Sequence, residues 1–244
     1  MEKILIVNDL TKLYKNGRGV KNISFEVKRG DVIGLLGPNG SGKTTIMKTI
    51  MGLCHATSGS ISVFGRDVEN DVENALKKVG GLIERPAIFE YLSARENLKM
   101  VARYYDNVDD ARIDKVLEIV RMSRYAKEKA GRFSLGMKQR LGLAMAMLSE
   151  PELIILDEPT NGLDIEGTVE IREIIKALAR EKGTSFLIAS HIASELEKTC
   201  NKVAVIHEGE LLSFDTMEET LRLNPSLEDY FLAKVKDKRG SVII

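Results

Sequence analysis

The sequence predicts an α/β fold with a parallel β-sheet at its core, and three observations lead to this prediction. A glycine-rich segment, 37–44, lies between an apolar run at 32–36 and a helix-compatible run at 45–50. A second apolar run, 153–156, ends in two carboxylates and is typical of a buried parallel strand. Between these runs, residues 72–148 have mostly helical patterning, which indicates a helical insertion between parts of one sheet domain.

The N-terminal region carries short strand signals. Residues 4–7 and 23–27 have strand composition, and residues 61–64 form a short strand that is followed by a glycine. A glycine-containing turn at 16–19 separates the first two strands. A second turn, 28–31, leads into the apolar run before the glycine-rich segment.

The remaining elements follow in order along the chain. Within the helical block we expect strand 79–83, helices 97–104 and 113–120, and a connector with a capping residue at 108–110. After the second apolar run we expect helix 165–181, strand 185–189, hairpin strands 203–207 and 210–214, and a tail from residue 225 that forms a docked amphipathic helix and a frayed, charged end at 234–239.

Size and charge limit the classes of function. The 244 residues fit one large domain with a small appendage, which we place at 1–222 and 223–244. Lys+Arg and Asp+Glu are 36 each, so the basic excess of a general nucleic-acid binder is missing. Cys54 and Cys200 stand far apart, so we expect buried or idle thiols in a reducing compartment rather than metal ligands or a disulfide. With no signal-peptide pattern and no run near the ~20 apolar residues of a membrane span, we expect neither secretion nor membrane insertion.

The glycine-rich segment matches the phosphate-loop pattern G-x-x-x-x-G-K-[ST] in the strand–loop–helix context that the pattern requires. Glycines let successive backbone N–H groups face one anion, and the following helix adds its positive N-terminal end. We expect the Lys43 ammonium to reach the β- and γ-phosphates of a nucleotide and the Thr44 hydroxyl to bind Mg²⁺. A chance glycine-rich turn is the alternative, which the flanking strand and helix disfavour. The predicted nucleotide contacts are Gly37, Pro38, Asn39, Gly40, Ser41, Gly42, Lys43, Thr44 and Thr45.

Two carboxylates, Asp157 and Glu158, directly follow the second apolar run. They therefore lie at the C-terminal edge of a strand, where open α/β sheets bind ligands. Asp157 is placed to hold Mg²⁺ through its water shell, and Glu158 to orient and deprotonate a water that attacks the γ-phosphate. Acidic residues commonly end strands, so the pair indicates a site only together with the phosphate loop.

With these motifs the chain resembles the nucleotide-binding subunits of ATP-binding-cassette (ABC) transporters, from residue 4 to 214. The family carries a second signature, usually L-S-G-G-Q, in its helical block. Here Phe133-Ser134-Leu135-Gly136-Met137 stands at that place and keeps Ser134 and Gly136. The resemblance implies a P-loop NTPase of ABC type with a parallel-sheet core, an N-terminal antiparallel β subdomain and a helical subdomain near 86–150. It also implies a head-to-tail dimer, in which this signature faces the γ-phosphate bound by the other copy, although Ser134 is equally a good helix N-cap.

Three further matches follow from the resemblance. Tyr14 stands where the family stacks an aromatic ring on adenine, and Val20 is expected to pack beside it. Asp164, in the loop after the strand-end carboxylates, is expected to reach across the dimer, with a helix N-cap as the alternative role. His191 matches the histidine that contacts the γ-phosphate. Without the resemblance, Tyr14 is typical of a surface tyrosine and His191 is unremarkable.

One position departs from the family pattern. Members usually have glutamine where this chain has Glu84, and Pro86 with residues 95–98 supports that alignment. A glutamate binds Mg²⁺ more strongly but adds negative charge beside the phosphates. The alternative is a substitution that is merely tolerated on a loop. Together with residues 134–140, Glu84 makes the chain similar to the bacitracin- and lantibiotic-type subunits, which export antimicrobial peptides or confer immunity to them.

The resemblance implies ATP hydrolysis with ATP and Mg²⁺ as cofactors. It assigns catalysis to Lys43, Ser134, Glu158 and His191, and metal binding to Thr44, Glu84 and Asp157. A separate multispan membrane permease would dock near 84–91, which places the chain in the cytoplasm on the inner face of the cell membrane, with no nucleic-acid partner. The alternatives are an ABC exporter subunit for an unrelated substrate, a soluble ABC-type ATPase of translation or DNA repair, and a P-loop kinase or GTPase.

Overall fold

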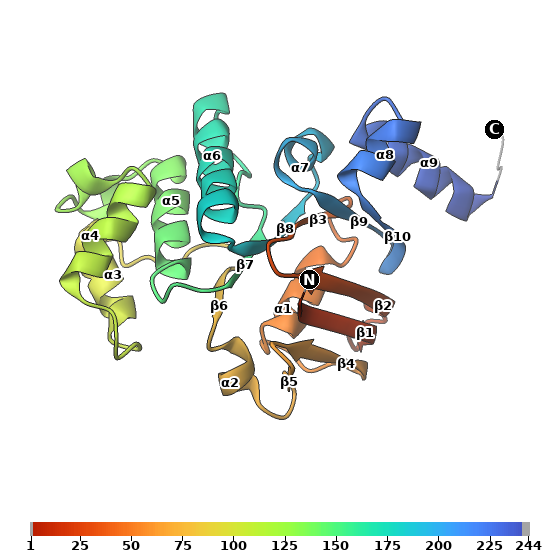
Figure 1. Cartoon of the computed structure of the whole chain (residues 1–244), viewed down its shortest axis with the longest axis horizontal. Helices are drawn as coiled ribbons and strands as arrows, with labels where there is room; N and C mark the ends of the chain where they lie inside the picture. The colour runs from red at the N-terminus through yellow and green to blue at the C-terminus, as the bar shows by residue number, and fades with distance from the viewer. Residues whose placement is uncertain (1, 241–244) are drawn as a thin grey trace.

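The computed structural model describes residues 2–240, in which two β-sheets are covered by helices (Figure 1). The larger sheet has the strand order β10 (Glu210–Thr216), β9 (Lys202–His207), β3 (Val32–Leu36), β8 (Ser185–Ser190), β7 (Leu153–Asp157) and β6 (Val79–Leu82). Its neighbouring strands are parallel except for the β9–β10 hairpin. The smaller sheet is antiparallel, with the order β2 (Gly19–Lys28), β1 (Lys3–Leu13), β4 (Ser58–Val63) and β5 (Arg66–Asp67).

The larger sheet separates two hydrophobic cores because its strands are apolar on both faces. Ile155 and Leu187 face a core that they share with the smaller sheet and with α1 (Lys43–Ile50). Their neighbours Leu156 and Ile188 face the opposite core, as the two-residue period of a strand requires. The helix that follows the glycine-rich segment is therefore packed into the core beside the smaller sheet.

Helices cover the second core and lie at both ends of the molecule (Figure 1). Helices α3, α4 and α5 gather at one end, and α8 and α9 lie at the other, with the larger sheet between them. Short 3₁₀ turns occur at Ser123–Tyr125 and Ala130–Arg132. The helices are α2 (Val72–Leu76), α3 (Ala94–Ala102), α4 (Asp110–Ile119), α5 (Leu135–Ala146), α6 (Ile165–Lys182), α7 (Ala193–Thr199), α8 (Met217–Leu223) and α9 (Leu227–Arg239).

Capping residues explain where the helices of the central block begin. The Ser93 hydroxyl accepts the Glu96 N–H (3.2 Å), and the Glu96 carboxylate accepts the Ser93 N–H (2.7 Å), so α3 begins at residue 94 rather than at 97. The Asp109 carboxylate accepts the Arg112 N–H at 2.7 Å, which confirms the capped connector before α4.

The charged end of the chain is helical, so the expectation of a frayed segment at 234–239 is wrong. These residues form the last turns of α9, which packs against the β9–β10 hairpin. Lys238 Nζ pairs with Glu210 on β10 (2.9 Å), and the Tyr230 hydroxyl lies 2.8 Å from Ser213 Oγ. These tertiary contacts hold the helix in place. The final part of the predicted appendage, residues 241–244, lies outside the described residues.

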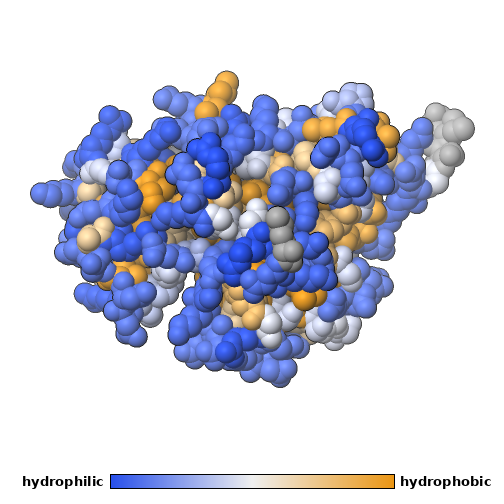
Figure 2. Space-filling model, viewed as in Figure 1, coloured by the Kyte–Doolittle hydropathy of each residue, from blue (hydrophilic) through white to orange (hydrophobic). Residues whose placement is uncertain are grey.

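The visible surface is mostly hydrophilic, with apolar side chains in separate patches (Figure 2). This agrees with a charged fraction of 30%. Within residues 2–240, no helix combines the length and the apolar composition needed to cross a membrane.

The turn between β9 and β10 braces the glycine-rich segment. The Gly209 N–H donates to the Ser41 carbonyl (3.0 Å), and the Gly209 carbonyl accepts the Lys21 N–H (2.8 Å). A Cβ at Gly209 would lie 2.5 Å from the carbonyl oxygen of Gly19, and its φ of +78° is in the left-handed region. The turn therefore needs glycine for space as well as for backbone conformation.

We expect Gly209→Ala to lower the free energy of unfolding by more than about 2 kcal/mol, because it adds a backbone clash to an unfavourable φ. Gly30→Ala is the matched control: φ is +82°, and nothing lies within 4 Å of the added Cβ. Gly30→Ala should lower the free energy of unfolding by about 1 kcal/mol. Chemical denaturation measures both values, and equal losses would contradict the bracing role of the turn.

Candidate nucleotide-binding site

The glycine-rich segment forms a loop at the carboxyl edge of β3, in the interior of the larger sheet. Two of its glycines have no room for a side chain. A Cβ at Gly37 would lie 2.1 Å from the Ile206 carbonyl oxygen, and one at Gly42 would lie 2.3 Å from Val20 Cγ1. The loop backbone therefore packs directly on β9 and β2, which fixes its curvature.

A cleft of about 1390 Å³ lies beside this loop. Its walls come from the loop and α1, the turn between β1 and β2, the segment after β6, the start of α5, the end of β7 and the turn after β9. Of the predicted loop contacts, Asn39, Gly40, Gly42, Lys43, Thr44 and Thr45 line the cleft, whereas Gly37, Pro38 and Ser41 do not.

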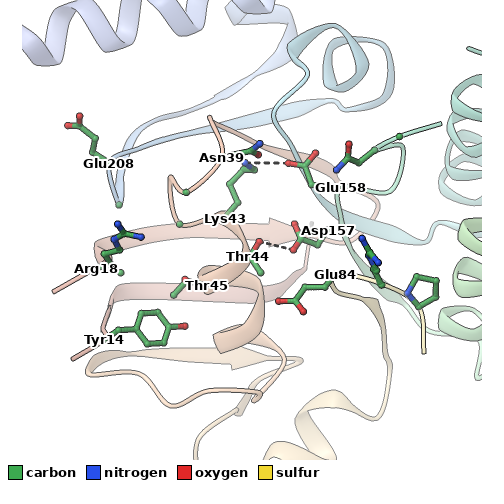
Figure 3. A pocket seen from close by; sticks show the side chains of 18 of the residues that line it. Tyr14, Arg18, Asn39, Lys43, Thr44, Thr45, Glu84, Asp157, Glu158 and Glu208 are labelled. Atoms are coloured by element: carbon green, nitrogen blue, oxygen red, sulfur yellow. Dashed lines mark hydrogen bonds and ion pairs between the residues drawn. The ribbon is translucent and has the colours of Figure 1, made fainter. Parts of the chain in front are cut away.

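Lys43 is a buried cation at the end of the loop. Its ammonium donates to the carbonyls of Gly37 (2.7 Å) and Pro38 (3.2 Å) and lies 3.4 Å from Glu158 Oε1 (Figure 3). Only 5% of the residue is exposed. The loop's own carbonyl oxygens thus hold a charge in a buried position, from which an anion in the cleft can attract it.

Thr44 and Asp157 are joined across the cleft floor. The Thr44 hydroxyl donates to Asp157 Oδ2 at 2.8 Å (Figure 3). Burial raises the pKa of Asp157, an effect that the Thr44 hydrogen bond opposes. Asp157 Oδ1 is buried and has no hydrogen-bond partner among the described residues. A hydroxyl and a carboxylate with a spare buried oxygen form a donor set that fits Mg²⁺.

Glu158 lies between two nitrogen donors. Its Oε2 is 2.8 Å from His191 Nδ1, and its Oε1 is the oxygen near Lys43. Its φ of +50° is unusual for a residue with a side chain and indicates that the site fixes this backbone conformation. His191 follows β8 and does not line the cleft itself, so it reaches the cleft through Glu158.

Tyr14 and Val20 lie in different environments. Tyr14 lines the cleft, is 42% exposed, and has Lys12 Nζ 5.3 Å from its ring centre. Val20 is fully buried beneath Gly42 and does not line the cleft. Val20 therefore packs against the phosphate loop at Gly42, and its predicted place beside adenine stays a prediction.

Ser134, Gly136 and Asp164 lie outside the cleft walls. Ser134 Oγ accepts the N–H of Met137 (3.2 Å), and Asp164 Oδ1 accepts the N–H of Gly167 (2.8 Å), so both residues are N-caps. Both are exposed. Their helix ends lie close together, since a Cβ at Gly136 would be 3.7 Å from Leu163 Cδ2.

Glu84 is paired with a lysine. Its Oε1 lies 2.5 Å from Lys48 Nζ, and this hydrogen bond raises the pKa of Lys48. Figure 3 shows the Glu84 side chain pointing from its loop toward α1, near Asp157. The Glu84 φ is +65°. Glu84 therefore lies at the cleft as expected, but with a counter-charge that the sequence patterns did not indicate.

The sequence patterns also missed cleft residues from two turns. Arg18 comes from the turn before β2 and Lys21 from the first residues of β2, and Glu208 and Glu210 come from the β9–β10 hairpin. Their only sequence signal was turn composition, which indicates where the chain reverses but not what the turn approaches.

The proteins that this chain resembles are ATP-binding proteins, as the geometry of the cleft predicts. The ABC transporter family model matches residues 20–161. The chain belongs to the ABC transporter family. It is an ATP-binding subunit with ATPase activity, and the predicted ABC-type fold is confirmed.

Relatives of this ABC transporter subunit include named transport proteins. It is 41% identical to the bacitracin transport ATP-binding protein BcrA of Bacillus licheniformis, over all of this chain and 79% of that protein. It is 39% identical to the lantibiotic transport ATP-binding protein SrtF of Streptococcus pyogenes, over 93% of this chain and 96% of that one. A solved ATP-binding subunit of an ABC transporter superposes with a TM-score of 0.84 at 29% identity, covering 96% of this chain and all of that chain.

We expect Asp157→Asn to stabilise the nucleotide-free protein at neutral pH. The folded state binds the Asp157 proton more tightly than the unfolded chain does, so ionisation of this buried carboxylate destabilises the fold. This penalty is complete above the raised pKa and absent below the ordinary carboxyl pKa of about 3.9. Thermal unfolding in EDTA at several pH values should show a gain at pH 7 that disappears as the pH falls. A gain of constant size would contradict the burial argument.

Proposed function

We propose that this ATPase powers a separate multispan membrane permease that exports, or confers immunity to, an antimicrobial peptide of the bacitracin or lantibiotic type. The observation that carries the ATPase part is the convergence of Lys43, Thr44, Asp157 and Glu158 on one cleft. The substrate class is supported by the names of the relatives and by Glu84 at the position where the family usually has glutamine.

The side chains divide the work of hydrolysis. The buried Lys43 ammonium moves from the loop carbonyls to the β- and γ-phosphates of ATP, where it stabilises developing charge. Thr44 and Asp157 would hold Mg²⁺, which neutralises phosphate charge when it is bound, with Glu84 as a third candidate ligand. Glu158 accepts the proton of the attacking water, and His191 orients the Glu158 carboxylate through their 2.8 Å contact and then approaches the γ-phosphate.

A second copy completes this site in our proposal. Ser134 and Asp164 are exposed polar caps outside the cleft of their own chain. Beside them, Leu135 is 50% exposed and Ile165 is 86% exposed, so apolar surface is available next to the polar caps. Two copies that meet head to tail bring the Ser134 and Gly136 helix end of one copy to the γ-phosphate held by the other.

The permease is proposed to dock beside the Glu84 loop. Phe89 is 44% exposed and Tyr91 is 69% exposed, and their rings are 6.0 Å apart. Aromatic side chains are enriched at protein interfaces. This contact would hold the subunit at the cytoplasmic face of the membrane.

Glu158→Gln should bind ATP, remain as a dimer with ATP trapped, and lose hydrolysis by roughly a factor of 100 or more, because an amide cannot take the proton. Phosphate release and size-exclusion chromatography with ATP measure the two effects. Lys43→Ala, which removes the phosphate contact, should remain a monomer without bound ATP. Turnover near the wild-type rate in Glu158→Gln would remove this residue from the base role.

Co-expression with its permease tests the transport role. We expect the pair to raise the inhibitory concentration of bacitracin or of a lantibiotic at least about fourfold in a sensitive strain, and the Glu158→Gln variant to remove this protection because it lacks hydrolysis. Protection against neither peptide, with an active ATPase and a co-purifying permease, would indicate an unrelated exported substrate. A failure to co-purify with any multispan protein would instead favour a soluble ABC-type ATPase.

A further inference from the structure

Six carboxylates line the cleft, where a nucleotide would add several more negative charges, and three of them belong to the residues predicted to bind or act on the nucleotide. Asp157 accepts a hydrogen bond from Thr44, and Glu158 lies between Lys43 and His191. The third carboxylate is Glu84, which lines the same cleft. Phosphates repel a carboxylate that has no cation beside it. The partner of Glu84 therefore determines how strongly this carboxylate opposes the binding of a nucleotide in the cleft.

That partner is Lys48, in the last turn of α1. Its Nζ lies 2.5 Å from Glu84 Oε1, and the lysine side chain is 33% exposed, against 62% for the glutamate. A helix C-terminus favours a cation, which helps to keep the lysine there. The two side chains together carry no net charge, as the neutral glutamine usual at this position would.

The Glu84 loop is held in position by packing that follows this residue and by its own backbone conformation. Two residues later, Pro86 packs on α5 so closely that a Cβ at Gly142 would lie 2.6 Å from Pro86 Cβ. Glu84 itself has the left-handed φ of +65°, which a residue with a side chain adopts only when its surroundings require it. The carboxylate is therefore directed at α1 by both the backbone and the ion pair.

We propose that Lys48 is a positioning residue whose charge neutralises Glu84, so that this carboxylate can stand beside the phosphates of bound ATP. The inference rests on the proposed ATP site. It assigns to Lys48 the role of counter-ion to a protein carboxylate, which differs from the direct phosphate contact assigned to Lys43.

A double-mutant cycle on the full chain, with wild type, Lys48→Met, Glu84→Gln and the double variant as its four corners, tests this role. Isothermal titration measures the ATP affinity of each variant. EDTA in the buffer removes Mg²⁺, which could otherwise replace the lysine as the counter-ion. Lys48→Met should weaken ATP binding about threefold to tenfold, and less at high ionic strength, because it leaves Glu84 uncompensated. Lys48→Met with Glu84→Gln should return to within about twofold of wild type, and Lys48→Arg should bind as wild type does.

Two results would overturn the inference. If the double variant binds as weakly as Lys48→Met, the lysine attracts the phosphates directly. If Lys48→Met binds as wild type does, its charge has no role at the site. Should Lys48→Met fail to fold by circular dichroism, Lys48→Gln, alone and with Glu84→Gln, provides the same comparison.

A distant ion pair of equal length serves as the control. Lys3 and Glu26 are 2.5 Å apart on the smaller sheet and do not line the cleft. Lys3→Met should leave ATP affinity unchanged, and a comparable loss there would show that any lost ion pair weakens binding, which overturns the specific role of Lys48. If wild type does not bind ATP, or Lys43→Ala binds it normally, the proposed function itself fails, and with it the site on which this inference rests.

Discussion

The close packing of the phosphate loop on its neighbours is the constraint on which the rest of the site depends. Gly37 lies against the Ile206 carbonyl and Gly42 against Val20, so the loop backbone touches β9 and β2 directly. Any side chain at these two positions would push the loop away from the sheet. The buried Lys43 ammonium, which the carbonyls of the same loop hold, is correctly placed only while this packing is maintained.

Two of the three carboxylates near the phosphate loop have a nitrogen partner. Glu158 has Lys43 and His191, and Glu84 has Lys48. Asp157 has no ion pair among the described residues and accepts a hydrogen bond from the neutral Thr44 hydroxyl; burial raises its pKa, and Thr44 and the nearby charge of Lys43 oppose this rise. A buried carboxylate whose burial is only partly compensated is destabilising, so binding of a divalent cation here would relieve a cost already present in the fold. The burial of the ionised Asp157 carboxylate in the nucleotide-free protein thus favours the binding of a cation at this site.

The features that the sequence predicted well depend on local chemistry. The apolar runs became strands buried on both faces, and Ser134 and Asp164 became N-caps because a cap is decided within four residues. The features that it missed depend on distant contacts. Lys48 and Glu84 are far apart in the chain, and the charged segment 234–239 is helical because it packs on the β9–β10 hairpin. Composition and spacing carry no record of such contacts.

The capping roles of Ser134 and Asp164 are compatible with a role toward a second copy. Each cap uses one acceptor: Ser134 Oγ takes the Met137 N–H, and Asp164 Oδ1 takes the Gly167 N–H. The Ser134 hydroxyl can still donate a hydrogen bond, and the second Asp164 oxygen can still accept a hydrogen bond. Capping fixes the direction of both side chains before a partner arrives, which lowers the entropy lost on binding. Because Gly136 and Leu163 lie close together, the two helix ends can be presented to a partner as one surface.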